Sequence, residues 1–198
     1  MFTGIIREIG TVTKTESQKG LLRLYVQAPK TASGLEPLES ISVNGVCLSL
    51  VCVRKASLVF EVIPETLRLT NLGRLRCGSR VNIEPSLSLS DRINGHIVLG
   101  HIDGTGTVCS RRWLGGELVL GIRLSKPLAH LLAAKGSVTV DGVSLTVGPK
   151  IRNAIFTVHL IPETLRQTTL EHLRVKSAVN IEIDYLAKLV RSFLQNRT

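Results

Sequence analysis

Two small side chains that can act as nucleophiles, Cys47 and Ser144, stand at equivalent places in two similar stretches of this sequence. Each is separated by a single valine from a turn-type dipeptide, Asn44-Gly45 or Asp141-Gly142. A thiol or hydroxyl becomes a nucleophile or a proton donor when neighbouring groups activate it. The same pattern is typical of small residues at a strand start. The pair therefore indicates either polar walls of two related pockets or two ordinary strand positions.

His101 is the third candidate for chemistry. It follows Leu99-Gly100, whereas the corresponding stretch near the start, Thr3-Gly4, is followed by isoleucine. A side chain that titrates near neutral pH suits proton abstraction, and a hydrogen-bonded strand histidine is the alternative. His96 and His159 have less to recommend them. The sequence shows no P-loop, dinucleotide fingerprint, Ser-His-Asp pattern or metal-binding cluster.

These residues belong to an internal duplication. The hexapeptide Ile-Pro-Glu-Thr-Leu-Arg occurs at 63–68 and again at 161–166, 98 positions apart in a chain of 198 residues. Three further blocks recur in the same order at nearly the same offset: 10–12 with 106–108, 45–49 with 142–146, and 81–84 with 179–182. A period of this length is that of a small domain, so we expect two similar domains of about 95 residues.

Short alternating apolar runs between glycines and prolines predict β-strands, as in Leu22–Val26. Many such runs at short intervals favour a closed antiparallel barrel or a sandwich in each half. In the second half we expect strands at 106–110, 118–124, 138–140, 145–147, 155–160 and 179–183. Residues 64–72 and 126–135 are predicted to be helical.

The predicted domains are residues 1–90 and 94–183, with the weakly patterned stretch 85–94 as linker. The tail, 184–198, has no counterpart in the first half. Its apolar residues recur at helical spacing, and Asp184 is a plausible N-cap. They are Leu186, Leu189, Val190, Phe193 and Leu194. This amphipathic helix either packs on its own domain or joins chains together.

Composition narrows the function classes. The net charge is +10, but the bases are spread along the chain and aromatic residues make up 4%, which argues against nucleic-acid binding. The four cysteines lack CxxC spacing and are typical of reduced thiols. The start carries no secretory pattern, and no apolar run is long enough for a bilayer. We expect a cytoplasmic protein that binds neither membranes nor metals.

Several motifs together carry a resemblance to a known family. They are Met1–Ile6, Val43–Leu48, Thr70–Gly73, Gly95-His96, Gly100–Gly104, Val140–Val147 and the doubled Glu-Thr-Leu-Arg. With them the sequence resembles the riboflavin synthase family, alpha-chain type, whose members contain duplicated lumazine-binding barrels. The resemblance covers nearly the whole chain.

The resemblance implies an all-β fold of two similar six-stranded antiparallel Greek-key barrels and a C-terminal helix. It implies a transferase without cofactor or metal, which converts two molecules of 6,7-dimethyl-8-ribityllumazine into riboflavin and 5-amino-6-ribitylamino-2,4(1H,3H)-pyrimidinedione by transfer of a four-carbon unit. It further implies a homotrimer, held by residues 184–198, with the active site between subunits. The resemblance leaves open whether the trimer docks onto lumazine synthase.

The resemblance also assigns residues to two substrate pockets, one in each half. The first-half pocket would use Gly4, Ile5, Ile6, Cys47, Leu48, Ser49, Glu61, Val62, Ile63, Pro64, Glu65 and Thr66. The second-half pocket would use Gly100, His101, Ile102, Lys135, Ser144, Leu145, Thr146, His159, Leu160, Ile161, Pro162, Glu163 and Thr164.

Residues tied to catalysis by the same resemblance are His101, Cys47, Ser144, Thr146, Asp184, Ser40 and Phe2. The family also contains non-catalytic, antenna-type proteins that bind lumazine or flavin without turnover and lose polar pocket residues in the second half. Lys135, Ser144, Thr146 and Asp184 are all retained here. The enzyme is therefore favoured, and the binding protein is the alternative.

Overall fold

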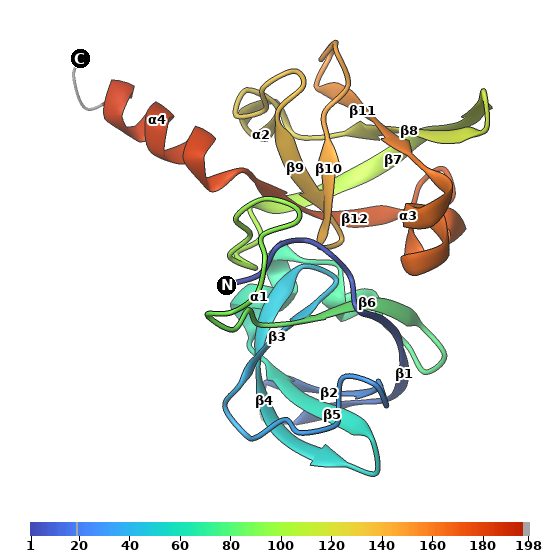
Figure 1. The fold of residues 1–198 in the computed structure, drawn as a ribbon, viewed down its shortest axis with the longest axis vertical. Coiled ribbons are helices and arrows are strands. Elements are labelled where there is room, and N and C mark those ends of the chain that lie inside the picture. The colour runs from blue at the N-terminus through green and yellow to red at the C-terminus, as the bar shows by residue number, and fades with distance from the viewer. Residues whose placement is uncertain (19, 196–198) are drawn as a thin grey trace.

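The computed structural model describes residues 1–18 and 20–195, which form two stacked β units and a projecting C-terminal helix (Figure 1). The first unit is a closed antiparallel barrel with strand order β1-β2-β5-β4-β3-β6. Its strands are β1 (Glu8–Gln18), β2 (Leu21–Gln27), β3 (Ser40–Val43), β4 (Val46–Arg54), β5 (Ser57–Val62) and β6 (Arg80–Pro85).

The second unit repeats this arrangement as a six-stranded sheet with the order β10-β9-β12-β7-β8-β11. Its strands are β7 (Gly104–Leu114), β8 (Glu117–Arg123), β9 (Ser137–Val140), β10 (Val143–Thr146), β11 (Ile155–Leu160) and β12 (Ala178–Ile183). Beyond the end of β10, the amide of Gly148 donates to the carbonyl of Thr157 at 2.7 Å, which brings the two sheet edges together. The predicted all-β fold with two similar six-stranded units is confirmed.

Both copies of the hexapeptide start a short helix, α1 (Pro64–Leu69) and α3 (Pro162–Gln167). Proline suits the first helical turn because its missing amide would have no partner there. The 3₁₀ turns η1 (Leu72–Arg74) and η2 (Thr169–His172) follow. The expected helix at 126–135 is wrong beyond its first turn. Only α2 (Lys126–Ala129) forms, and Lys135 takes a left-handed φ of 62° as the chain turns towards β9.

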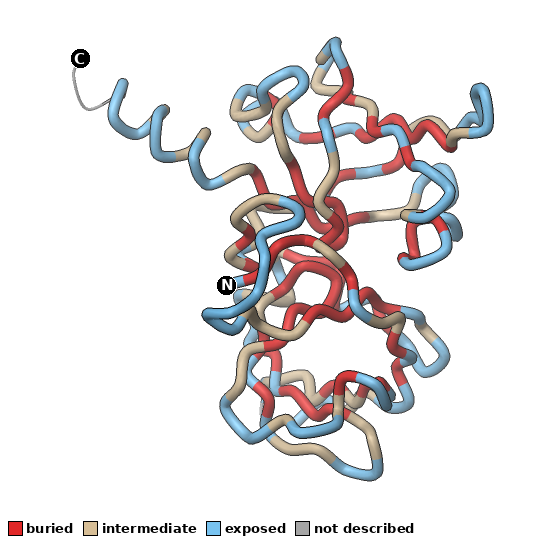
Figure 2. Tube along the Cα trace, in the orientation of Figure 1, coloured by how far each residue is buried: buried red, intermediate tan, exposed pale blue. Residues whose placement is uncertain are grey.

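The tail forms α4 (Tyr185–Gln195), which projects away from both barrels and is largely exposed (Figures 1 and 2). Asp184 caps it, since its Oδ1 accepts a hydrogen bond from the amide of Leu186 at 3.0 Å. Residues 196–198 of the predicted tail lie outside the described residues. Within the described part of the chain, every helix falls short of the length and apolar composition that a bilayer crossing requires.

Each barrel has its own apolar core, and the two barrels meet through a buried polar junction. Asn44 and Asp141, at equivalent turns, accept hydrogen bonds at 2.8 Å from the amides of Asn82 and Asn180 in their own barrels. The side chains then cross over. Asn82 Nδ2 donates to the carbonyl of Asp141, and Asn180 Nδ2 to that of Asn44, both at 2.9 Å. Reciprocal contacts of this kind relate the two barrels by an approximate twofold axis.

Asp141→Asn should stabilise the protein increasingly as pH rises. Burial raises the pKa of Asp141 from 3.8 to about 7, although hydrogen bonds from Asn180 and Asn71 act in the opposite direction. Because the folded-state pKa is the higher one, this carboxyl contributes its full stability only below pH 3.8 and loses it as pH rises through 7. Asparagine removes that loss, on the order of 2–4 kcal/mol.

The measurement is urea unfolding of both proteins at several pH values from 4 to 8. Asn44 already fills the equivalent position in the first barrel, so the substitution fits the junction geometry. The stability difference between variant and parent should grow with pH. A difference that stays constant across this range would contradict the prediction.

Candidate functional site

Each barrel receives a short segment from the other half of the chain. The amide of Ser144 in β10 donates to the carbonyl of Gly4 at 2.8 Å, and the amide of Cys47 in β4 donates to the carbonyl of Gly100 at 2.9 Å. Both glycines have a left-handed φ, 76° and 77°. A Cβ on either would lie within 2.7 Å of the residue it covers, so only glycine allows this approach. We call residues 2–6 and 98–102 the crossing segments.

The crossing segments are seated by apolar packing. Ile6 is buried in the core of the second barrel, and Ile102 packs against the core of the first. The segments also pair with each other, because the amide of Phe2 donates to the carbonyl of Val98 at 2.7 Å and the reverse bond measures 3.1 Å. Phe2 is fully buried. It therefore belongs to the junction that positions both segments.

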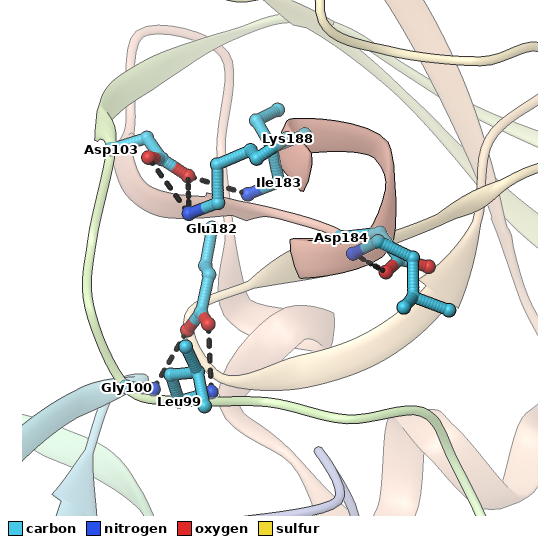
Figure 3. Close-up of polar contacts among 8 residues, drawn as sticks. Leu99, Gly100, Asp103, Glu182, Ile183, Asp184 and Lys188 are labelled. Atoms are coloured by element: carbon cyan, nitrogen blue, oxygen red, sulfur yellow. Dashed lines mark hydrogen bonds and ion pairs between the residues drawn. The ribbon is translucent and has the colours of Figure 1, made fainter. Parts of the chain in front are cut away.

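Two buried carboxylates anchor the crossing segments to their own barrels. Glu84 in β6 accepts hydrogen bonds from the amides of Thr3 and Gly4 at 2.7 and 3.0 Å. Glu182 in β12 accepts from the amides of Leu99 and Gly100 at 2.7 and 2.9 Å (Figure 3). Burial raises the pKa of both carboxyls, that of Glu182 to about 7, while the backbone donors oppose the shift.

Asp103, just past the second crossing segment, ties this region to α4. Its carboxylate accepts from the amide of Ile183 at 2.8 Å and from Lys188 Nζ at 3.0 Å (Figure 3). In the sequence, Asp184 follows Ile183 and precedes Lys188. The start of α4 is thus held in a fixed relation to the segment that carries Gly100 and His101.

A cavity of about 450 Å³ lies between the first crossing segment and the second barrel. Its lining is Gly4, Ile5, Ile6, Arg7, Val143, Ser144, Ile161, Glu163, Thr164, Gln167 and Thr168. The volume is in the range of small-molecule sites. Its lining differs from the expected grouping, which placed Gly4, Ile5 and Ile6 in a pocket of the first half. The exchange of segments moves them to the second barrel.

His96 is a site residue that sequence reasoning undervalued. Its Nδ1 lies 2.7 Å from Oγ of Ser144, and its amide donates to the carbonyl of Thr3. Burial lowers the pKa of His96, and the negative charge of Asp184 opposes this shift. A mostly neutral imidazole therefore shares a hydrogen bond with the Ser144 hydroxyl. No local pattern around His96 marks this contact, because Ser144 is 48 positions away.

The first barrel presents an equivalent surface under the second crossing segment. Cys47 and Ser49 share one face of β4, as Ser144 and Thr146 do in β10. Ser49 pairs with Ser40 across the strands. His101, which is exposed, directly follows the glycine that rests on Cys47. Thr66 in α1 is the counterpart of cavity-lining Thr164.

The remaining predicted site residues fall into distinct environments. Val62, Leu48 and Leu160 are buried in the barrel cores, and Leu145 packs against one, so their side chains face inward. His159 Nδ1 pairs with Glu117 at 2.9 Å. The other predicted residues are exposed and lie at strand ends, at helix starts or, for Lys135, in the turn before β9. They are Glu61, Ile63, Pro64, Glu65, Lys135 and Pro162. No group of His, Cys, Asp and Glu within residues 1–18 and 20–195 is arranged to hold a metal ion.

Comparison with known proteins agrees with this duplicated geometry. The model of the lumazine binding domain matches the chain twice, at residues 3–86 and 99–184. The riboflavin synthase of Mycobacterium tuberculosis (strain ATCC 25618 / H37Rv) is 42% identical, with 99% of each chain covered. That of Bacillus subtilis (strain 168) is 35% identical over 98% of this chain and 90% of its own.

The chain belongs to the riboflavin synthase family. A solved structure of LumP complexed with riboflavin is 25% identical and superposes with a TM-score of 0.84, covering 92% of this chain and 99% of that one. A second LumP structure, complexed with 6,7-dimethyl-8-(1'-D-ribityl) lumazine, is 23% identical with a TM-score of 0.83. Both share the fold of this riboflavin synthase family member.

Proposed function

We propose that this protein catalyses the dismutation of two 6,7-dimethyl-8-ribityllumazine molecules to riboflavin and 5-amino-6-ribitylamino-2,4(1H,3H)-pyrimidinedione. The observation that carries the proposal is the repetition of one site architecture in both barrels, each covered by a crossing segment of the other half. Two similar pockets suit two identical substrates. Full-length similarity to riboflavin synthases supports the same assignment.

In this proposal the residues that face the cavity bind substrate, and the polar groups near it handle protons. Ser144 and Thr146 offer hydroxyls in the second barrel, while Cys47, Ser49 and Ser40 offer polar groups on the equivalent strands of the first. His101 is the candidate base. His96 positions the Ser144 hydroxyl through the contact between its Nδ1 and Oγ of the serine.

We also propose that the protein works as a cytoplasmic homotrimer with each active site shared between two chains. Support comes from α4, which projects away from both barrels (Figure 1) and whose residues are largely exposed along its length (Figure 2). Phe193 and Leu194 are 71% and 65% exposed, which is unusual for large apolar groups that have no partner surface. Holding two lumazines in register across such an interface would supply much of the rate.

The deciding experiment is incubation of the purified protein with the lumazine alone. Absorbance change and green riboflavin fluorescence should develop without added metal or nicotinamide and survive chelation followed by gel filtration. An antenna-type protein would bind the lumazine, seen as a change in its fluorescence, but form no riboflavin. Activity that returns only with a metal or NAD would contradict the proposal.

Cys47→Ser should keep most of the turnover rate. The serine hydroxyl preserves a small polar group beneath Gly100, where the backbone contact is made by the amide of residue 47 and not by its side chain. Single-turnover rates of the two proteins measure this. A loss of several orders of magnitude would instead indicate that the thiolate acts covalently.

A further inference from the structure

A second cavity, of about 470 Å³, opens at the junction of the two barrels and shares no lining residue with the cavity of about 450 Å³ under the first crossing segment. Its floor consists of buried, hydrogen-bonded residues of the junction: Asn44, Asn71, Asp141 and Thr169. The floor is fixed, because Asn71 Nδ2 donates to Asp141 Oδ1 at 2.9 Å and the amide of Thr169 donates to Asn82 Oδ1 at 2.8 Å. The volume is that of a small-molecule site.

The mouth of this cavity is lined by basic residues from both halves of the chain. Arg74 ends η1 and His172 ends η2, and they are 98 positions apart, as the two hexapeptides are. Both line this cavity, one from each half of the chain. Arg80, at the start of β6, brings its Nη1 to 2.6 Å from Nε2 of His172.

The charged residues around the mouth of the cavity are almost all positive. The loops 73–80 and 171–178 carry five lysines and arginines, with Glu171 as the single acid. Among the described residues, no carboxylate forms an ion pair with Arg74 or Arg80. A guanidinium can only donate, so Nε2 of His172 is the acceptor in its contact with Arg80. An anion at this point would accept charge-assisted hydrogen bonds from Arg74 and Arg80, which otherwise lack a carboxylate partner in the described part of the chain.

Asp141 is the one acid on the floor. Its Oδ1 is occupied by donors from Asn71 and Asn180, and burial raises its pKa to about 7. The carboxyl is therefore partly protonated at neutral pH and can donate a hydrogen bond as well as accept one. It does not cancel the positive potential of the mouth.

We propose that the junction cavity binds the phosphate group of a small phosphate monoester, with Arg74 and Arg80 as donors and His172 as a neutral partner that orients Arg80. Arginine suits this role because its planar fork can bind two phosphate oxygens at once. The cavity is much larger than one ion needs, since a water molecule fills only about 30 Å³. The organic part of the ester would lie over the polar floor, and binding would clamp the two barrels together.

The test is calorimetric titration of the full chain with glucose 6-phosphate, inorganic phosphate and pyrophosphate at constant ionic strength set by chloride. Saturable binding, tightest for the sugar phosphate, is expected. The double variant Arg74→Gln/Arg80→Gln should weaken it about tenfold or more, because two charge-assisted contacts are lost. Lumazine binding should stay intact, which shows that the variant is folded.

The matched control is Arg54→Gln/Arg152→Gln. These exposed arginines occupy equivalent places in the two barrels, lie outside the cavity lining, and remove the same charge. The control should bind the sugar phosphate as the parent does. Equal weakening in both double variants, or no saturable binding of any of the three compounds, would overturn the proposal. Inorganic phosphate binding as tightly as the ester would retain the phosphate site and overturn the monoester assignment.

Discussion

Refolding two inactive variants together should restore part of the activity. Thr66→Trp fills the first-barrel pocket and Thr164→Trp fills the second, at equivalent positions of α1 and α3. If each site joins the first barrel of one chain to the second barrel of another, mixed assemblies contain some interfaces with both pockets intact. About a quarter of the interfaces would be intact after random mixing of equal amounts.

The controls are each variant refolded alone, which should stay inactive. Thr164 is preferred to Ser144 as the blocked position, because the backbone of Gly4 and Gly95 lies directly against Ser144 and would be displaced. If each site lay within one chain, every chain in the mixture would still be blocked and no activity would return. A fully active monomer that lacks residues 185–198 would also contradict a shared site.

His101→Gln should lower the turnover rate far more than it weakens lumazine binding. The reaction must remove a proton from the acidic 7-methyl group of one lumazine, and a placed general base contributes about 10²–10⁴-fold to such a step. His101 is exposed and follows the glycine that rests on Cys47, so glutamine should fit without disturbing a core. Single-turnover rates and fluorescence titrations separate the two effects.

His130→Gln is the matched control, since His130 is an exposed histidine at the end of α2. It should leave both rate and binding unchanged. His96→Gln offers a useful contrast, because it breaks the contact with Ser144 and should affect lumazine binding as well as rate. Equal losses of affinity and rate in His101→Gln would make His101 a binding residue.

Local pattern predicted most of the fold. Alternation located strands such as β11, and the proline of the repeated hexapeptide marked the start of α1 and α3. Asp184 was recognisable as a cap because the helical spacing begins directly after it. The α2 region was overpredicted, since its Leu and Ala content favours helix while the turn into β9 requires the left-handed Lys135.

The candidate site was less accessible to sequence reasoning, because it depends on which barrel each crossing segment covers. Gly4 and Gly100 indicate a turn or a close approach, but their partners are over 50 residues away or in the other half. One signal was present. The Val-Asn-Ile-Glu block places the same polar residues inside both last strands, and polar residues repeated within buried strands indicate a shared structural task. In this protein the asparagines, Asn82 and Asn180, form the buried junction between the barrels. The glutamates, Glu84 and Glu182, anchor the crossing segments.

The exchange of crossing segments has a consequence for the origin of the two pockets. Two separate copies of one half, placed about the same axis, would make these contacts as an arm-exchanged homodimer, and fusion of the genes would turn it into one chain. In a homodimer every substitution appears in both pockets. After fusion, the first-barrel pocket could combine Cys47 with His101 of the second crossing segment, while the second-barrel pocket combined Ser144 with Ile5 of the first. A reaction between two identical molecules needs unequal roles for them, and a fused chain allows each role to evolve separately.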